Sequence, residues 1–139
     1  MKLRIRGNSV RLRLTKAEVR DLALVGQVEE RVQIGIGPDA YLRYRIEAGP
    51  ISAITSRLEV HTVIISVPVE TARHWEANDL VGLYTETAWG LRIAVEKDFR
   101  CLDPSRTEDE SDAFDNPSAA CSNICDGEGV SPGATTTLP

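Results

Sequence analysis

The sequence has few aromatic residues and no long apolar run, and both shortages narrow the classes of protein to which it can belong. Aromatic side chains make up 5% of its 139 residues, too few for the stacking platforms that bind single-stranded nucleic acid. It contains no apolar run of about 20 residues, the length that crosses a bilayer. The charged opening at residues 2–6 lacks the apolar stretch of a signal peptide. We therefore expect a cytoplasmic protein that binds neither membranes nor nucleic acid.

Cysteine and the common catalytic motifs are also scarce. The three cysteines, Cys101, Cys121 and Cys125, are an odd number, so at least one has no partner within the chain, as suits a reducing compartment. The sequence contains no phosphate-binding loop and no nucleophile elbow. Neither His61 nor His74 has a partner at metal-ligand spacing. These gaps favour binding over catalysis.

The charge is distributed unevenly along the chain. Residues 1–100 carry fifteen Lys and Arg against thirteen Asp and Glu, whereas residues 101–139 carry one against eight. From residue 103 onward apolar residues are rare, and such a composition cannot bury enough surface to offset the entropy of ordering. The sequence predicts one globular domain over residues 1–102. An acidic, disordered tail over residues 103–139 follows it, with Phe114 as a single anchor.

The most specific local pattern is at the start of the chain. Residues 1–6 and 9–14 alternate apolar and cationic residues around Gly7-Asn8, a pattern typical of a β-hairpin. With a two-residue loop, facing positions have numbers that sum to fifteen, and the cations share one sheet face: Lys2, Arg4, Arg6, Arg11 and Arg13. Like charges in facing positions cost roughly 0.2 to 1 kcal/mol per pair. This face is therefore expected to meet carboxylates, a bound anion or water.

The remaining patterns indicate two helices and further strands. Thr15 and Glu18 have the spacing of a capping box, and Pro68 suits the first position of a second helix. Strands are expected over residues 28–34, 41–47, 58–67, 81–87 and 91–99. The order strand, helix, strand, strand then occurs twice, over residues 10–47 and 63–98. The sequence predicts an α+β fold with two helices on one face of a mainly antiparallel, twisted sheet of seven or eight strands, either open or partly closed into a barrel.

Three more arginines and two carboxylates complete the candidate site residues. Arg43, Arg45 and Arg92 lie in predicted strands and join the hairpin cations as candidates for binding an anion. Glu96 and Asp98 lie two apart on the same side of the last strand, a spacing that could hold a hard divalent cation. Alternatively, these carboxylates neutralise Arg92 and the hairpin cations. Both interpretations stay open at this point.

Three segments carry a resemblance to a known family: residues 2–14 (KLRIRGNSVRLRL), residues 95–102 (VEKDFRCL) and residues 112–117 (DAFDNP). In these segments the chain resembles a family of small bacterial proteins classed as a domain of unknown function, over about residues 1–117. The resemblance implies a cytoplasmic bacterial protein. It brings no established activity.

The sequence as a whole favours a non-catalytic binding module that needs no cofactor and whose basic sheet face holds an anionic ligand or an acidic protein segment. A first alternative is a metal-dependent phosphohydrolase resembling triphosphate tunnel enzymes. In that case Glu96 and Asp98 would hold Mg²⁺ and arginines would bind the phosphates. A second alternative is a structural protein that dimerises through its sheet. The sequence does not predict the oligomeric state.

Overall fold

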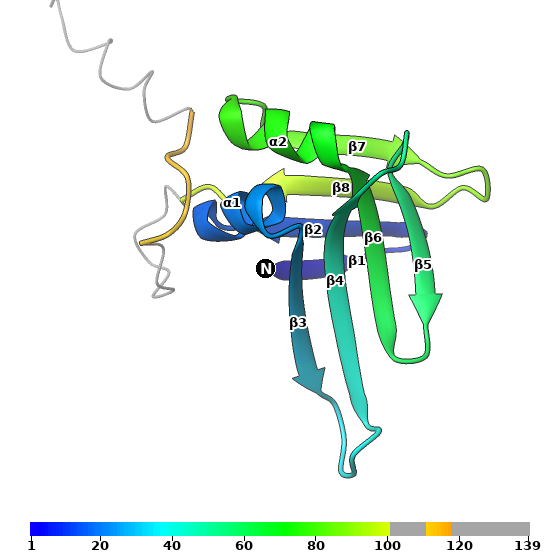
Figure 1. The fold of residues 1–139 in the computed structure, drawn as a ribbon. Helices are drawn as coiled ribbons and strands as arrows, with labels where there is room; N and C mark the ends of the chain where they lie inside the picture. The colour runs from blue at the N-terminus through cyan, green and yellow to red at the C-terminus, as the bar shows by residue number, and fades with distance from the viewer. Residues whose placement is uncertain (101–110, 118–139) are drawn as a thin grey trace, which may run out of the picture.

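The computed structural model describes residues 1–100 and 111–117, which form two four-stranded sheets and two helices (Figure 1). The strands are β1 (Lys2–Ile5), β2 (Ser9–Leu14), β3 (Gln27–Gln33), β4 (Tyr41–Gly49), β5 (Thr55–Glu59), β6 (Thr62–Pro68), β7 (Gly82–Glu86) and β8 (Arg92–Lys97). The helices are α1 (Lys16–Leu24) and α2 (Val69–Ala77). Sheet A has the strand order β1-β2-β8-β7, and sheet B has the order β3-β4-β6-β5.

The predicted α+β class and the two helices are confirmed, whereas the single sheet is wrong, since the strands form two mixed sheets, and the mainly antiparallel pairing is only partly right. The outer strand pairs are antiparallel, whereas the central pairs β2–β8 and β4–β6 are parallel. In the described residues neither sheet closes into a barrel. Figure 1 shows the strands of sheet A running crosswise to those of sheet B. Each parallel pair joins distant parts of the chain, and alternation within one strand gives no sign of such a pairing.

The first hairpin has the predicted register. Lys2 lies opposite Arg13 and Arg4 lies opposite Arg11. Gly7 occupies the first turn position with φ of 53°, the positive value that a two-residue type II′ turn requires there. The cations of this hairpin therefore share one face of sheet A, as the sequence predicts.

Local signals also place both helices. The Thr15 hydroxyl accepts a hydrogen bond from the Glu18 amide at 3.4 Å, and the Glu18 carboxylate accepts one from the Thr15 amide at 2.9 Å. This confirms the capping box. The second helix begins directly after Pro68. In the described part of the chain, neither helix is long and apolar enough to cross a membrane.

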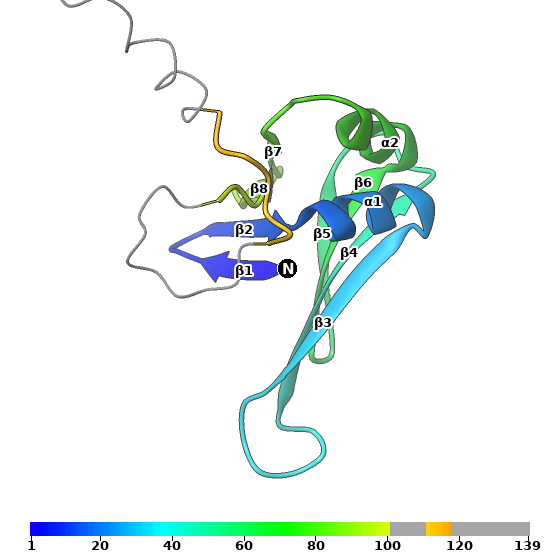
Figure 2. The ribbon, with the colours of Figure 1, turned by 90° about the vertical axis from the view of Figure 1, so that its left-hand side faces the viewer.

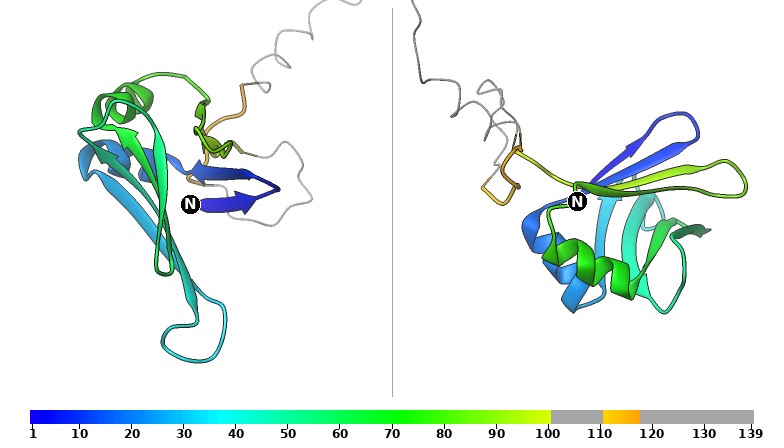
Figure 3. Two further views of the ribbon diagram at one scale, coloured as in Figure 1. Left: turned by 90° about the vertical axis from the view of Figure 1, so that its right-hand side faces the viewer. Right: turned by 90° about the horizontal axis from the view of Figure 1, so that it is seen from above.

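The core lies where the two helices meet the inner faces of the sheets. The helices contact each other, α1 contacts strands of both sheets, and α2 packs on β4 and β6. Figures 2 and 3 show the helices side by side, with the β1–β2 and β7–β8 hairpins projecting away from them. The largest fully buried side chains of this core are those of Trp75, Leu12, Leu14, Leu22, Ile46, Ile65 and Ile93.

One predicted strand is two strands in the structure. Residues 58–67 are divided between β5 and β6 by a turn at Val60 and His61. Val60 has φ of 47°, a value that β-branched residues rarely adopt. The sequence therefore shows no turn signal at this point. The central place expected for the segment does hold for β6, where Ile64 and Ile65 are both buried although they point to opposite faces.

The order of elements is repeated, and the repeat extends to the register of the strands. The succession β1-β2-α1-β3-β4 is followed by β5-β6-α2-β7-β8. The order β1-β2-β8-β7 of sheet A therefore corresponds, strand for strand, to the order β5-β6-β4-β3 of sheet B. Leu14 is the last residue before the N-cap of α1, and it pairs with Lys97 in sheet A. Val67 is the last residue before the N-cap of α2, and it pairs with Ala48 in sheet B. The two sheets are thus equivalent frameworks that carry different side chains.

The segment 111–117 lies against the body through Phe114. The Phe114 amide donates to the Asp98 carbonyl at 2.8 Å, and its carbonyl accepts from the Arg100 amide at 2.7 Å. The Phe114 ring centroid lies 5.8 Å from that of Phe99. Phe114 therefore contacts the body, and it is not the single contact of this segment, because Ala113 is buried and the Asp112 carbonyl accepts from the Lys16 amide at 3.1 Å. Most of the predicted disordered tail, residues 103–110 and 118–139, lies outside the described residues.

The two equivalent turns lead to a stability prediction. Val60, whose side chain is exposed, stands where the first half has Gly7. A left-handed conformation costs a residue with a side chain about 1–2 kcal/mol, and the backbone entropy of glycine offsets about 0.5–1 kcal/mol of the gain. Val60→Gly should therefore raise the free energy of unfolding by up to about 1.5 kcal/mol, and Gly7→Val should lower it by a similar amount. Urea denaturation measures both, and a lower midpoint for Val60→Gly would contradict the argument.

Candidate functional site

The outer faces of the two sheets, which point away from the core, carry most of the charged strand residues. Side chains alternate along each strand, so the strand register defines three rows across sheet A. The rows are Arg6, Ser9, Arg92 and Glu86; Arg4, Arg11, Ala94 and Tyr84; Lys2, Arg13, Glu96 and Gly82. We call this surface the cationic face. It collects six of the eight predicted anion-binding candidates.

Arg43 and Arg45, the other two candidates, lie on the outer face of sheet B. The equivalent rows there are Glu59, Thr62, Arg43 and Arg31; Arg57, Ile64, Arg45 and Glu29; Thr55, Ser66, Glu47 and Gln27. We call this surface the ion-pair face. The structure therefore does not bring Arg43 and Arg45 together with the hairpin cations.

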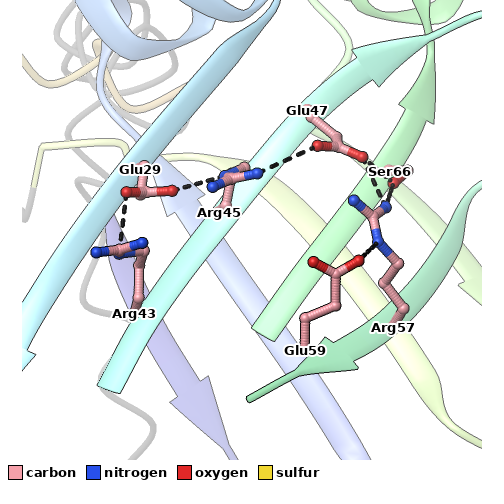
Figure 4. A network of polar contacts seen from close by, with 7 residues as sticks. All are labelled: Glu29, Arg43, Arg45, Glu47, Arg57, Glu59 and Ser66. Atoms are coloured by element: carbon pink, nitrogen blue, oxygen red, sulfur yellow. Dashed lines mark hydrogen bonds and ion pairs between the residues drawn. The ribbon is translucent and has the colours of Figure 1, made fainter. Parts of the chain in front are cut away.

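On the ion-pair face, acidic and basic side chains alternate and neutralise one another (Figure 4). Glu29 lies 3.1 Å from Nε of Arg43 and 2.6 Å from Nε of Arg45. Ile64 lies between Arg45 and Arg57 in the register and is fully buried although it is on the outer face. Long arginine side chains can cover apolar surface with their methylene groups. The arginines here thus cover an apolar residue and have acidic partners.

The network continues through Glu47 to the edge strand. The Arg57 guanidinium donates to Glu47 at 2.7 Å through Nη1 and to Glu59 at 2.7 Å through Nε. The Ser66 hydroxyl donates to the same Glu47 oxygen at 2.9 Å. The hydrogen bond from Arg57 is the main cause that lowers the pKa of Glu47 below its ordinary value. Glu47 is therefore held in its charged form.

On the cationic face, one carboxylate serves two arginines. Glu96 lies 3.6 Å from Nε of Arg11 and 3.4 Å from Nε of Arg13. The Tyr84 hydroxyl donates to Glu96 at 3.3 Å. Partial burial, followed by the negative charge of Glu96, raises the pKa of Tyr84 above its ordinary value, so the hydroxyl remains a donor. Glu96 thus orders three neighbouring side chains.

The metal-ligand candidates Glu96 and Asp98 are both paired with cations. Asp98 lies 3.0 Å from Nζ of Lys2. Among the described residues, the ion pairs of these two carboxylates are with cations of the hairpin and not with Arg92. Within residues 1–100 and 111–117, no three His, Cys, Asp or Glu side chains gather in a group that could hold a metal ion.

The cationic face keeps an excess of positive charge. Its rows contain six cations and two carboxylates, whereas the rows of the ion-pair face contain four cations and three carboxylates. Within the part of the chain that the structure describes, the side chains of Arg4, Arg6 and Arg92 form no hydrogen bond or ion pair. The excess of positive charge on this face thus includes three arginines without an acidic partner among the described residues.

Two adjoining hollows lie on this face. The large hollow has a volume of about 520 Å³, and the residues that shape it include Ser9, Arg11, Tyr84, Glu86, Arg92 and Ala94. The small hollow has a volume of about 90 Å³ and is lined by Arg4, Arg6, Ser9 and Arg11. Because the two share Ser9 and Arg11, one ligand could occupy both.

Ala94 explains the room in the large hollow, and Gly82 explains the position of Tyr84 beside it. Ala94 occupies the position that Arg45 occupies in sheet B, so a methyl group stands where a long side chain would fill the space. A Cβ atom at Gly82 would lie 2.8 Å from the Tyr84 hydroxyl oxygen and 2.9 Å from the Val95 carbonyl oxygen. Glycine therefore allows Tyr84 to reach Glu96.

Sequence reasoning missed Ser9, Tyr84, Glu86 and Ala94, which help to form the large hollow. They join Arg11 on one face only because β2 pairs with β8 in parallel, and no local pattern indicates that pairing. A strand-by-strand alignment of the two halves of the chain would have given a signal, since Ala94 then stands at the position of Arg45.

The chain belongs to a family of unknown function, DUF7009, whose model matches residues 1–118. This confirms the resemblance noted in the sequence. No curated protein and no solved structure matches the chain.

Glu47 gives a pH prediction. Its pKa is lower in the folded protein than in the unfolded chain, so its stabilising contribution is complete above the ordinary glutamate pKa of about 4.3 and is lost as the pH falls through the folded-state value. Glu47→Gln should be less stable than the wild type at pH 7, and the difference should shrink toward pH 3. Thermal unfolding from pH 7 to pH 3 measures this, with Glu70→Gln on α2 as the control. A difference that does not change with pH would contradict the role assigned to Glu47.

Proposed function

We propose that this protein is a non-catalytic binding module that holds an anionic ligand on the cationic face of sheet A. The observation that carries the proposal is the small hollow, where Arg4, Arg6 and Arg11 surround a volume of about 90 Å³. Only Arg11 of these three has a carboxylate partner among the described residues, at 3.6 Å. This volume suits a single oxyanion, such as a phosphate group.

Arginine is suited to this task. Its planar guanidinium group donates two parallel hydrogen bonds to phosphate or carboxylate oxygens. The surrounding excess of cations also attracts anions from solution, an effect that salt weakens. The ion-pair face lacks this property, because its arginines already have partners on the protein.

The alternatives have less support. A metal-dependent phosphohydrolase would require Glu96 and Asp98 to leave the cations that now neutralise them. An acidic protein segment would suit an extended groove better than two compact hollows. Dimerisation through the sheet stays a prediction that sedimentation analysis can test.

The double variant Arg4→Gln/Arg6→Gln tests the proposal. Hydrogen bonds to charged groups contribute about 1.5–3 kcal/mol each, so the affinity for sodium pyrophosphate should fall at least tenfold. Isothermal titration calorimetry of the full chain at low salt measures the affinity. The matched control, Arg20→Gln/Arg73→Gln, removes the same charge from exposed positions on α1 and α2 and should stay within twofold of the wild type.

Two outcomes would overturn the proposal. Equal losses in the two double variants would show a non-specific charge effect, and no binding of pyrophosphate by the wild type would show that the face does not take small anions. Tighter binding of a polyglutamate peptide than of pyrophosphate would instead favour the acidic protein segment.

A further inference from the structure

Building on the proposed function, we infer that the ligand is a nucleoside phosphate. Its terminal phosphate would bind Arg4, Arg6 and Arg11 in the small hollow, and its base would lie in the large hollow above Ala94, beside the ring of Tyr84. The inference rests on how charge, aromatic surface and space are distributed across sheet A.

Positive charge decreases across the cationic face from the β1–β2 edge to β7. The edge pair β1–β2 carries Lys2, Arg4, Arg6, Arg11 and Arg13 in or next to its strands, whereas the opposite edge strand, β7, carries Tyr84 and Glu86 on this face. On β8, Arg92 lies opposite Glu86 in the register, so the two charges offset each other at the far side of the large hollow. Phosphate groups are thus attracted most strongly to the β1–β2 side, and a ligand that fills both hollows is expected to have its anionic end there and an uncharged end in the large hollow.

The uncharged end meets a surface suited to a planar base. The Tyr84 side chain is 61% exposed and stands beside the methyl floor formed by Ala94. Aromatic side chains provide a surface on which nucleic-acid bases stack. Glu86 offers carboxylate oxygens that can accept hydrogen bonds from amino or imino groups of a base. The hollow's volume of about 520 Å³ lies within the range usual for small-molecule sites, about 300–1,000 Å³.

The internal repeat supplies a comparison within the same chain. On the ion-pair face, Glu29 and Arg45 are cross-strand neighbours that form an ion pair at 2.6 Å. The equivalent positions on the cationic face hold Tyr84 and Ala94. Both members of the pair are therefore different: the carboxylate is replaced by an aromatic ring, and the arginine by a methyl group. Together these two differences create room and a stacking surface at the same place.

Tyr84 is also held in position before any ligand arrives. Its hydroxyl donates to Glu96 at 3.3 Å, and Gly82 leaves space for it. Glu96 in turn lies against Arg11 and Arg13. One network thus connects the proposed base site with the proposed phosphate site.

Isothermal titration calorimetry of the full chain tests the inference. It measures the affinities for ATP, GTP and UTP without added metal and compares each with the affinity for sodium tripolyphosphate. At least one nucleoside triphosphate should bind at least tenfold more tightly than tripolyphosphate. Tyr84→Ala should remove this difference, since tripolyphosphate has no base to stack. Tyr41→Ala, which removes a tyrosine from sheet B, is the matched control and should keep the difference.

Ala94→Arg distinguishes the effect of the hollow's shape on binding from the effect of its charge. The variant fills the large hollow with an arginine side chain, as at the equivalent position Arg45 of sheet B, and it adds a positive charge. If the base occupies the hollow, nucleoside triphosphate binding should weaken at least tenfold while tripolyphosphate binding changes less than threefold. If only charge matters, both should bind more tightly. If circular dichroism shows that Ala94→Arg does not fold, Ala94→Leu takes its place, since leucine fills the hollow without adding a charge.

The two proposals fail in different ways. Equal affinities for every nucleoside triphosphate and tripolyphosphate, unaffected by Tyr84→Ala, would overturn the nucleoside inference and leave the anion-binding function standing. Binding of none of these anions would overturn both.

Discussion

The parallel pairing of β2 with β8, and of β4 with β6, is the constraint on which the rest of the structure depends. Each pairing joins a hairpin from one half of the chain to a hairpin from the other half. Two-stranded hairpins are marginally stable alone, so neither half can complete a four-stranded sheet without its counterpart. The same pairing places Arg11 beside Ala94 and Arg13 beside Glu96, and it therefore builds the cationic face as well as the fold.

The equivalence of the two sheets shows how one framework supports two kinds of surface. In sheet B, Arg45 connects Glu29 with Glu47, and the arginine side chains also cover Ile64. This surface contributes ion pairs and covers an apolar residue. In sheet A, the alanine at the equivalent position leaves a hollow bordered by arginines. The backbone accounts for the similarity, and a few side-chain differences account for the proposed function.

Local features could be predicted from the sequence because neighbouring residues determine them. The register of the first hairpin follows from Gly7-Asn8 and the flanking alternation, and the capping box follows from Thr15 and Glu18. The division into two sheets could not be predicted, because it depends on parallel pairs between distant segments. The turn at Val60 gave no signal, since a β-branched residue rarely adopts that conformation. The cations of the site could be named in advance, but Tyr84 and Ala94 required the pairing of β8 with its neighbours.

A nuclear magnetic resonance titration tests the central claim, that the outer face of sheet A is the anion-binding surface, most directly. The full chain, labelled with nitrogen-15, would be titrated with sodium pyrophosphate while the backbone amide resonances are followed. The account predicts that shifts concentrate in β1, β2 and β8 around Arg4, Arg11 and Arg92, with the amides around Arg45 and Arg57 in sheet B unaffected. Shifts centred on sheet B, or spread evenly over both sheets, would contradict it.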